Sequence, residues 1–307
     1  MAIRIMPKQP KRLFFLVSIL AVVLAIQWGY PAVNEMLWRP SVTIATDHYV
    51  IYSTATPEQT RDIGQVLEAL HSTYARFFAS FPQVSREHPK LKLKLFKNRE
   101  EFRKCSSVVA WAEGYYERPF CRAYYNNGSN SAFWMVHEAV HQLNAEVTSL
   151  GLAKWAEEGV ATYFSTSVYA QGTFHPGELD RNTYPLWWVE EMALSGDINK
   201  DIANTLIIPL RVVITHRGGP NLDRYFNLYY IHWWSLAHFL FHYENRKYRS
   251  NALQVLREGG TLKSFEKHIG PVAKVQTEWY RYLQELQRQL NSPLPRNTET
   301  NKTPPSR

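Results

Sequence analysis

The stretch of this chain whose residue types can do chemistry is Phe-Trp-Met-Val-His-Glu-Ala-Val-His-Gln-Leu at residues 133–143. His137 and His141 are four residues apart, so on a helix they share one face. Their imidazole nitrogens can then bind a single metal ion. Glu138 can hold or deprotonate a water molecule on that ion. The spacing therefore predicts two metal ligands and a general base.

The surrounding residues predict a helix from about residue 131 to residue 146. Apolar side chains recur at helical spacing, and residues 127–131 (Asn-Gly-Ser-Asn-Ser) supply turn and N-cap types just upstream. The motif arises by chance in roughly a few in a hundred chains of this kind. A surface helix with two unrelated histidines is therefore the alternative, and a third ligand is needed to decide against it.

A carboxylate for that third ligand occurs in a second predicted helix. Residues 154–164 have the sequence Lys-Trp-Ala-Glu-Glu-Gly-Val-Ala-Thr-Tyr-Phe, in which Glu158 precedes Gly159. Glycine lacks the side chain that would keep two helices apart. Zinc hydrolases commonly use three protein ligands and leave the fourth position to water. His137, His141 and Glu158 would complete such a site.

In these two motifs the chain resembles the gluzincin metallopeptidases of the peptidase MA-like superfamily. His-Glu-x-x-His followed by Trp-x-x-Glu-Gly-x-Ala-x-Tyr-Phe carries the resemblance, which is closest to an exported bacterial branch known only as a domain of unknown function. The likeness extends to residues 91–96, 99–102, 114–116, 208–210 and 230–240. It implies an α+β fold, with a small mixed sheet beside the catalytic helices and a mainly helical C-terminal part. One departure is that sixteen residues separate His141 from Glu158, slightly fewer than in the aminopeptidase branch.

The resemblance also implies roles for further residues. Zn²⁺ would be the cofactor, and Glu138 would take a proton as zinc-bound water attacks a peptide carbonyl. A tyrosine downstream of the third ligand would stabilise the oxyanion. Tyr230 is the candidate, with Tyr229 and His232 behind it, and a plain aromatic core residue is the other interpretation. Residues 120–125 would form the edge strand that pairs with extended substrate, unless they belong to a structural hairpin.

Other acids and histidines are weaker candidates for the metal. Glu157 lies about 100° around the helix from Glu158, so both cannot face one ion. Glu158 is preferred because, as in the family, it precedes the glycine. Glu146 would reach the ion only if its helix broke. His238 and His242 are also four residues apart but have no adjacent acid, so we expect packed histidines there.

Length and composition fit one large core. The chain has 307 residues, of which 45% are hydrophobic and 14% aromatic, and residues 35–290 are expected to form a single zinc metallopeptidase-like domain. The formal charge of +8 is concentrated in the two ends of the chain. Without a basic stripe or a Gly-rich phosphate loop, we expect no nucleic-acid partner. The tail, residues 291–307, contains four prolines and is expected to be disordered.

Residues 1–34 have the composition of an export signal. Four basic residues and no acid accompany the apolar run Leu13–Ile26, which only Ser18 interrupts. Counting on to Val33, the segment is about long enough to span a membrane. No convincing Ala-x-Ala cleavage site follows, so an uncleaved signal anchor is favoured over a cleaved signal peptide. The positive-inside rule then places the body outside the cytoplasm, either membrane-anchored or, after cleavage, secreted.

The remaining pattern predicts a short series of elements. They are one or two strands over 42–54, a helix over 57–81, an edge or half-exposed strand over 91–96, a hairpin over 114–126, a loop over 171–185, and helices from 187, over 207–214, over 228–242 and over 275–290. Cys105 and Cys121 can form one bridge after export or remain free thiols. The sequence thus indicates a membrane-anchored, extracytoplasmic zinc-dependent hydrolase that acts on peptide or protein substrates. The alternative is an exported, non-catalytic binding or scaffold protein on the same fold.

Overall fold

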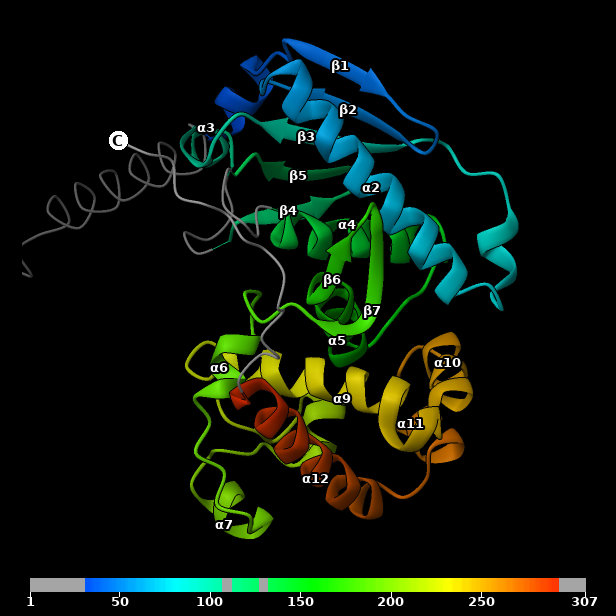
Figure 1. Ribbon diagram of the computed structural model, residues 1–307, viewed down its shortest axis with the longest axis vertical. Coiled ribbons are helices and arrows are strands. Elements are labelled where there is room, and N and C mark those ends of the chain that lie inside the picture. Colours follow the sequence, from blue (N-terminus) through cyan, green and yellow to red (C-terminus); the bar gives the residue numbers. More distant parts are fainter. Residues whose placement is uncertain (1–30, 107–111, 127–131, 293–307) are drawn as a thin grey trace, which may run out of the picture. The chain divides into compact units, whose positions relative to one another are not determined.

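A computed structural model of the chain describes residues 31–106, 112–126 and 132–292 (Figure 1). These residues form two compact units. Unit 1 runs to Ser149 and includes Ala170–Phe174, and unit 2 comprises Leu150–Tyr169 and the residues from His175 onward. Helices and strands are both present, which confirms the α+β class. Most of the predicted anchor, the predicted N-cap residues 127–131 and nearly all of the tail lie outside the described residues.

The sheet of unit 1 has five strands in the order β1-β2-β3-β5-β4. Their bounds are β1 Val42–Ala45, β2 Tyr49–Ser53, β3 Leu91–Phe96, β4 Gly114–Glu117 and β5 Phe120–Tyr124. The β1–β2 and β4–β5 pairs are antiparallel, whereas β2–β3 and β3–β5 are parallel. The predicted small mixed sheet is therefore confirmed, as are the two strands over 42–54 and the hairpin over 114–126.

The structure decides between the alternatives that the sequence left open for two strands. β3 and β5 both lie inside the sheet, and β4 is the edge strand on their side. Residues 120–124 therefore belong to a structural hairpin, and β3 is not an edge strand, although its side chains alternate between buried and partly buried. The ammonium of Lys94 lies 4.8 Å from the centre of the Phe120 ring and 2.7 Å from a carboxylate oxygen of Glu35. A lysine whose stem packs on an aromatic ring and whose charge is paired can therefore occupy an interior strand.

Helices α2 (Pro57–Phe77) and α4 (Phe133–Glu146) cover one face of the sheet, α2 over the β1–β2 side and α4 over β4 and β5 (Figure 1). α2 begins with a capping box between Thr56 and Gln59 and ends at Phe77, four residues before the expected end. Where the helices meet, the Tyr74 hydroxyl donates to Asn144 Oδ1 at 2.7 Å. The predicted helix over 131–146 is confirmed as α4.

A second, smaller core lies beside α3 (Arg99–Lys104). Phe96, Phe102 and Cys105 are buried together there. Partly buried aromatic side chains of Trp38, Tyr115 and Tyr124 pack around them. Cys105 and Cys121 are both buried free thiols, so the structure contains no bridge between them. The unit also contains the short 3₁₀ helix η1 (Pro82–Ser85) and a helical segment at residues 31–37.

Unit 2 is mainly helical, as expected. Its helices are α5 Lys154–Ser165, α6 Leu186–Glu190, α7 Ile198–Ala203, α8 Leu210–Thr215, α9 Phe226–Arg246, α10 Arg249–Arg257, α11 Leu262–His268 and α12 Val272–Asn291. It also holds most of β6 (Ser167–Ala170) and β7 (Thr173–Leu179), except for residues Ala170–Phe174, which belong to unit 1. The long helices predicted over 228–242 and 275–290 are confirmed as α9 and α12. No helix within the described ranges is both long and apolar enough to cross a membrane.

The loop predicted over 171–185 is in part wrong, because β6 and β7 pair as a two-stranded sheet. The connecting residues Gln171 and Gly172 both have positive φ, 50° and 73°. Two successive residues in this region form the tight turn whose twist suits a β-hairpin. The polar composition of the segment hid this turn, since Gln-Gly is a weaker signal than Asn-Gly.

The α5–α9 pair forms the core of unit 2, and Gly159 allows the two helices to approach. A Cβ atom at this position would lie 2.6 Å from the backbone oxygen of Trp233. Buried indoles fix the helices further: Trp155 Nε1 donates to the backbone oxygen of Gly260 at 2.6 Å, and Trp234 Nε1 donates to Thr166 Oγ1 at 3.0 Å. The glycine predicted to allow close helix packing does so against α9.

Candidate metal centre

The two predicted histidine ligands lie on one face of α4. His137 is buried and His141 half-buried, and their Nε2 atoms are 3.1 Å apart with the rings tilted by 81°. A tetrahedral zinc ion with nitrogen ligands at 2.0–2.1 Å places two such atoms roughly 3.3 Å apart. The helix therefore brings the two nitrogens to the separation that one ion requires.

Polar side chains on α4 hold this helix against the sheet. Gln142 is fully buried, and its Nε2 donates at 3.1 Å to the backbone oxygens of both Lys92 and Pro119. A buried hydrogen bond stabilises the fold only while its donor and acceptor stay aligned, and rotation of the helix would misalign them. Together with the Tyr74–Asn144 bond, they fix how α4 is turned and therefore where its histidines point.

The predicted general base, Glu138, is held by the edge strand. Its Oε2 accepts a hydrogen bond from the backbone N–H of Tyr116 on β4, at 3.0 Å. A Cβ atom at Gly114 would lie 3.1 Å from Glu138 Cγ and 3.1 Å from the backbone oxygen of Arg122. Neither feature was predicted from the sequence, because a backbone donor leaves no signature there. A glycine within a tyrosine-rich strand was the one signal available.

The rejected candidate Glu146 has other partners. Its Oε1 accepts from the Tyr116 hydroxyl at 2.6 Å, and its Oε2 accepts from Arg118 at 2.8 Å. Burial and this hydrogen bond to Glu146 raise the pKa of Tyr116. Glu146 thus fastens the hairpin of β4 and β5 to the end of α4.

The predicted third ligand, Glu158, lies on α5 in unit 2. It is 6% exposed, whereas the neighbouring Glu157 is half-buried. Its Oε2 accepts from the Tyr230 hydroxyl at 2.9 Å and its Oε1 accepts from Lys154 Nζ at 2.7 Å. Lys154 was not predicted, although its four-residue spacing from Glu158 on a helix is typical of an ion pair.

Of the three residues considered for the oxyanion role, Tyr230 is the one whose bond to Glu158 the structure records. The Tyr229 hydroxyl donates to the backbone oxygen of Pro220 at 3.0 Å. His232 is fully buried and accepts at Nε2 from the N–H of Ile208 at 3.2 Å, and burial lowers its pKa to about 4. Tyr229 and His232 therefore have structural roles.

The pair His238 and His242 is packed, as predicted. Tyr163 Oη lies 2.7 Å from His242 Nε2, and Tyr282 Oη lies 2.8 Å from His238 Nδ1. Burial lowers the pKa of His238 to about 3 and that of His242 to about 4, so both rings stay neutral. The hydroxyls of Tyr163 and Tyr282 thus provide a hydrogen-bond partner for each of the two rings.

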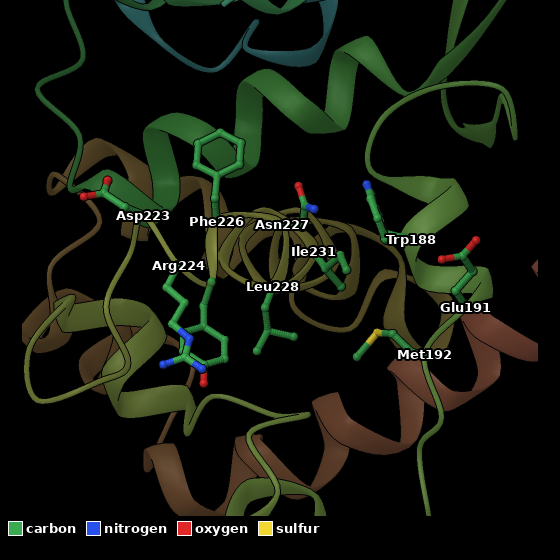
Figure 2. A pocket seen from close by; sticks show the side chains of 10 residues that line it. Trp188, Glu191, Met192, Asp223, Arg224, Phe226, Asn227, Leu228 and Ile231 are labelled. Carbon is green, nitrogen blue, oxygen red and sulfur yellow. The ribbon is translucent and has the colours of Figure 1, made fainter. Parts of the chain in front are cut away.

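Unit 2 also contains an open pocket of about 440 Å³ between the end of α6 and the start of α9, shown in Figure 2. It is lined by Trp188, Glu191, Met192, Asp223, Arg224, Tyr225, Phe226, Asn227, Leu228 and Ile231. Trp188 is 41% exposed, which is unusual for a tryptophan. The Phe226 ring is centred 4.4 Å from that of Tyr230. One wall of the pocket is therefore packed against the tyrosine that contacts Glu158.

No protein-family model matches this chain, and no curated protein matches its sequence. The resemblance to gluzincins accordingly depends on the motif residues, and the functional argument depends on the geometry of their side chains.

Proposed function

We propose that this chain is a zinc-dependent hydrolase that cleaves amide bonds in peptides or proteins, anchored to a membrane by its N-terminal segment and acting outside the cytoplasm. The observation that carries the proposal is the 3.1 Å separation of the His137 and His141 Nε2 atoms on α4. The two imidazoles are buried or half-buried, and their Nε2 atoms face each other, so a single cation could bind both.

The donor set suits zinc. His137, His141 and Glu158 offer two imidazole nitrogens and one carboxylate oxygen, and three ligands of these types leave one position for water. Tyr230 supports the third ligand, since a hydrogen bond to a ligating carboxylate fixes its orientation. Lys154 would keep the buried Glu158 carboxylate paired when no metal is bound.

The reaction follows from these residues. Zinc, when bound, supplies a Lewis acid that lowers the pKa of its water toward about 7. Glu138 would accept a proton from the attacking water and deliver it to the departing amine. The N–H of Tyr116 holds the Glu138 carboxylate in one orientation, so little reorganisation is needed. Once substrate is bound, the Tyr230 hydroxyl would turn its single proton from Glu158 to the oxyanion.

The pocket in unit 2 supports a peptide as the substrate. Its apolar lining from Trp188, Phe226 and Ile231 suits an apolar side chain. Its volume falls within the range of pockets that hold small ligands. An extended chain with apolar side chains would use such a pocket for specificity.

Metal analysis of the purified full-length chain tests the ligand set. We expect one zinc per chain by mass spectrometry, lost in both His141→Ala and Glu158→Ala and retained in Glu157→Gln. Absence of zinc from the folded chain after zinc is supplied would end the enzyme hypothesis. Loss of zinc from Glu157→Gln alone would assign the third ligand to the neighbouring residue.

Peptide-library hydrolysis tests the reaction. Glu138→Gln should keep zinc and lose turnover by about 10³-fold or more, because the general base is gone. Glu58→Gln, exposed in the first turn of α2, should keep both zinc and turnover. Zinc binding without hydrolysis of any peptide would favour the non-catalytic binding or scaffold protein.

A further inference from the structure

Residues 31–37, the first described residues of the chain, are helical. In this segment the apolar side chains face outward and the acidic side chain faces the unit, the reverse of the usual arrangement. Val33, Met36 and Leu37 are 49%, 67% and 62% exposed. They lie three and four residues apart and so share one face, here called the inverted face. They make up half of the large apolar side chains that are exposed in the described ranges, so this clustering calls for an explanation.

The other side of the same segment carries its acid inward. Glu35 Oε1 accepts from Lys94 Nζ at 2.7 Å and from Arg122 Nε at 2.8 Å, and the Arg122 side chain is only 8% exposed. Burial by itself raises the pKa of Glu35, but the hydrogen bonds from Lys94 and Arg122 outweigh it and hold the pKa below its usual value. Asn34 Nδ2 also donates to the backbone oxygen of Lys104 at 3.1 Å.

These bonds fix the rotation of the segment. Turning the inverted face toward the unit would move Glu35 away from Lys94 and from a nearly buried guanidinium, and would break both ion pairs. The three apolar side chains therefore stay outward. In water they would lose the free energy that the burial of apolar surface provides. An apolar medium outside the unit removes that cost.

The surroundings of the inverted face are basic. Residues 31–39 and 94–104 contain six basic and three acidic residues. The side chains of Arg99 and Lys104 on α3 are 57% and 58% exposed, although Glu113 and Glu100 pair with them. An apolar helical face flanked by lysine and arginine is typical of a segment that lies in the interface of an anionic bilayer.

The position of this segment in the sequence also indicates that it lies near a membrane. The apolar run Leu13–Ile26 ends only seven residues before Val33. Even fully extended, seven residues span at most about 25 Å, so the inverted face cannot lie far from wherever that run is embedded.

We propose that the inverted face lies in the interfacial layer of an anionic phospholipid bilayer, with α3 against the headgroups. Unit 1 is then held against the membrane by two contacts, the predicted anchor and this face. The proposal rests on the membrane anchor of the proposed function but not on zinc or hydrolysis, so the failure of the catalytic hypothesis and the failure of this proposal can be told apart.

Spin labelling of the full-length chain in vesicles of phosphatidylcholine and phosphatidylglycerol, three to one, tests the proposal. Met36→Cys carries the label, and Ser85→Cys, exposed in η1 of the same unit, is the matched control. We expect the label at residue 36 to collide with oxygen several-fold more often, relative to a water-soluble nickel complex, than the label at residue 85. Adding Leu37→Asp should lower that ratio, whereas Leu37→Ile should not.

Two outcomes would overturn the proposal. A ratio at residue 36 equal to that at residue 85 would mean that the inverted face is in water. Low collision rates with both reagents would mean that protein covers it, either the N-terminal residues folded back or a second copy. Dilution to less than one chain per vesicle separates these two, since only a second copy is lost.

Discussion

The two helices that carry the predicted metal ligands are held by different forces. α4 is fixed by polar contacts: Gln142 and Asn144 bond to neighbouring elements, and Glu138 accepts from a backbone N–H. α5 packs closely on α9, because Gly159 lets the backbone of α9 approach, and the Trp155 indole adds one bond to the backbone oxygen of Gly260. Side-chain bonds to the sheet distinguish the histidine helix, and close backbone packing distinguishes the glutamate helix. A mutation that disturbs α4 should therefore reorient its side chains, whereas a mutation that disturbs α5 should reduce the packing of unit 2.

Among the variants that test this difference between the two helices, Gly114→Ala should have the largest effect, a loss of turnover. Gly114→Ala puts a methyl group 3.1 Å from Glu138 Cγ and from a backbone oxygen, so the carboxylate that we propose as the general base must move. A displacement of about 1 Å can lower turnover by about 100-fold. Peptide hydrolysis and zinc content measured together should show lost turnover with zinc retained. Gly151→Ala, whose methyl group would meet nothing within 4 Å, is the control, and equal activity of both variants would contradict the role of β4.

The next largest effect is at Gly159. Gly159→Ala forces a methyl group to 2.6 Å from the backbone oxygen of Trp233, and overpacking of this kind costs about 2 kcal/mol. Urea denaturation should show that loss in unit 2. Gly64→Ala is the matched helix variant. Its methyl group would meet the side chains of Thr46 and Ile51 at 3.2 and 3.4 Å, which can shift. Equal losses would show that backbone approach is unimportant.

A smaller effect is expected at Tyr230. Tyr230→Phe removes the donor to Glu158 Oε2, and loss of a hydrogen bond to a ligating carboxylate weakens zinc binding about 10-fold. Zinc titration against a competing chelator measures this change. Tyr229→Phe, which loses only a bond to a backbone oxygen, should leave the affinity unchanged. Reduced turnover with unaltered zinc affinity would instead limit Tyr230 to the oxyanion role.

The smallest effect is at Lys154. Lys154→Gln removes a cation that is 2.7 Å from Glu158 Oε1 and would repel a metal cation. The Lys154 side chain is 49% exposed, so solvent screens the interaction and the gain is about 1 kcal/mol. Zinc affinity should rise several-fold in the same titration. Lys274→Gln, exposed on α12, should change nothing, and a fall in affinity for Lys154→Gln would make the lysine a supporting residue.

The sequence predicted the helices of the site better than its strands. α4, α5, α9 and α12 follow from apolar periodicity, which is a local property. The places of β3 and β5 inside the sheet depend on parallel pairing between distant segments and on Glu35, which neutralises Lys94 from 59 residues away. No local pattern contains that information.

The same division holds for the candidate site. The two histidines, Glu138 and Glu158 were predicted by motif and resemblance, and Tyr230 was chosen among three aromatic residues without a deciding signal. The bond from Tyr230 to Glu158 depends on how α5 packs against α9. The N–H of Tyr116 was missed because every residue except proline has one.

The attachment of Glu35 to Lys94 and Arg122 has a mechanical consequence. β1 is the first strand in the chain and lies at an edge of the sheet, so a pull on the N-terminal end would be expected to peel it away first. The ion pairs from Glu35 instead pass such a force to β3 and β5, in the interior of the sheet. Interior strands are bonded on both sides and must shear along their length rather than unzip. Tension at residue 31 should therefore meet its first resistance from the interior strands of the sheet, before β1 carries any load.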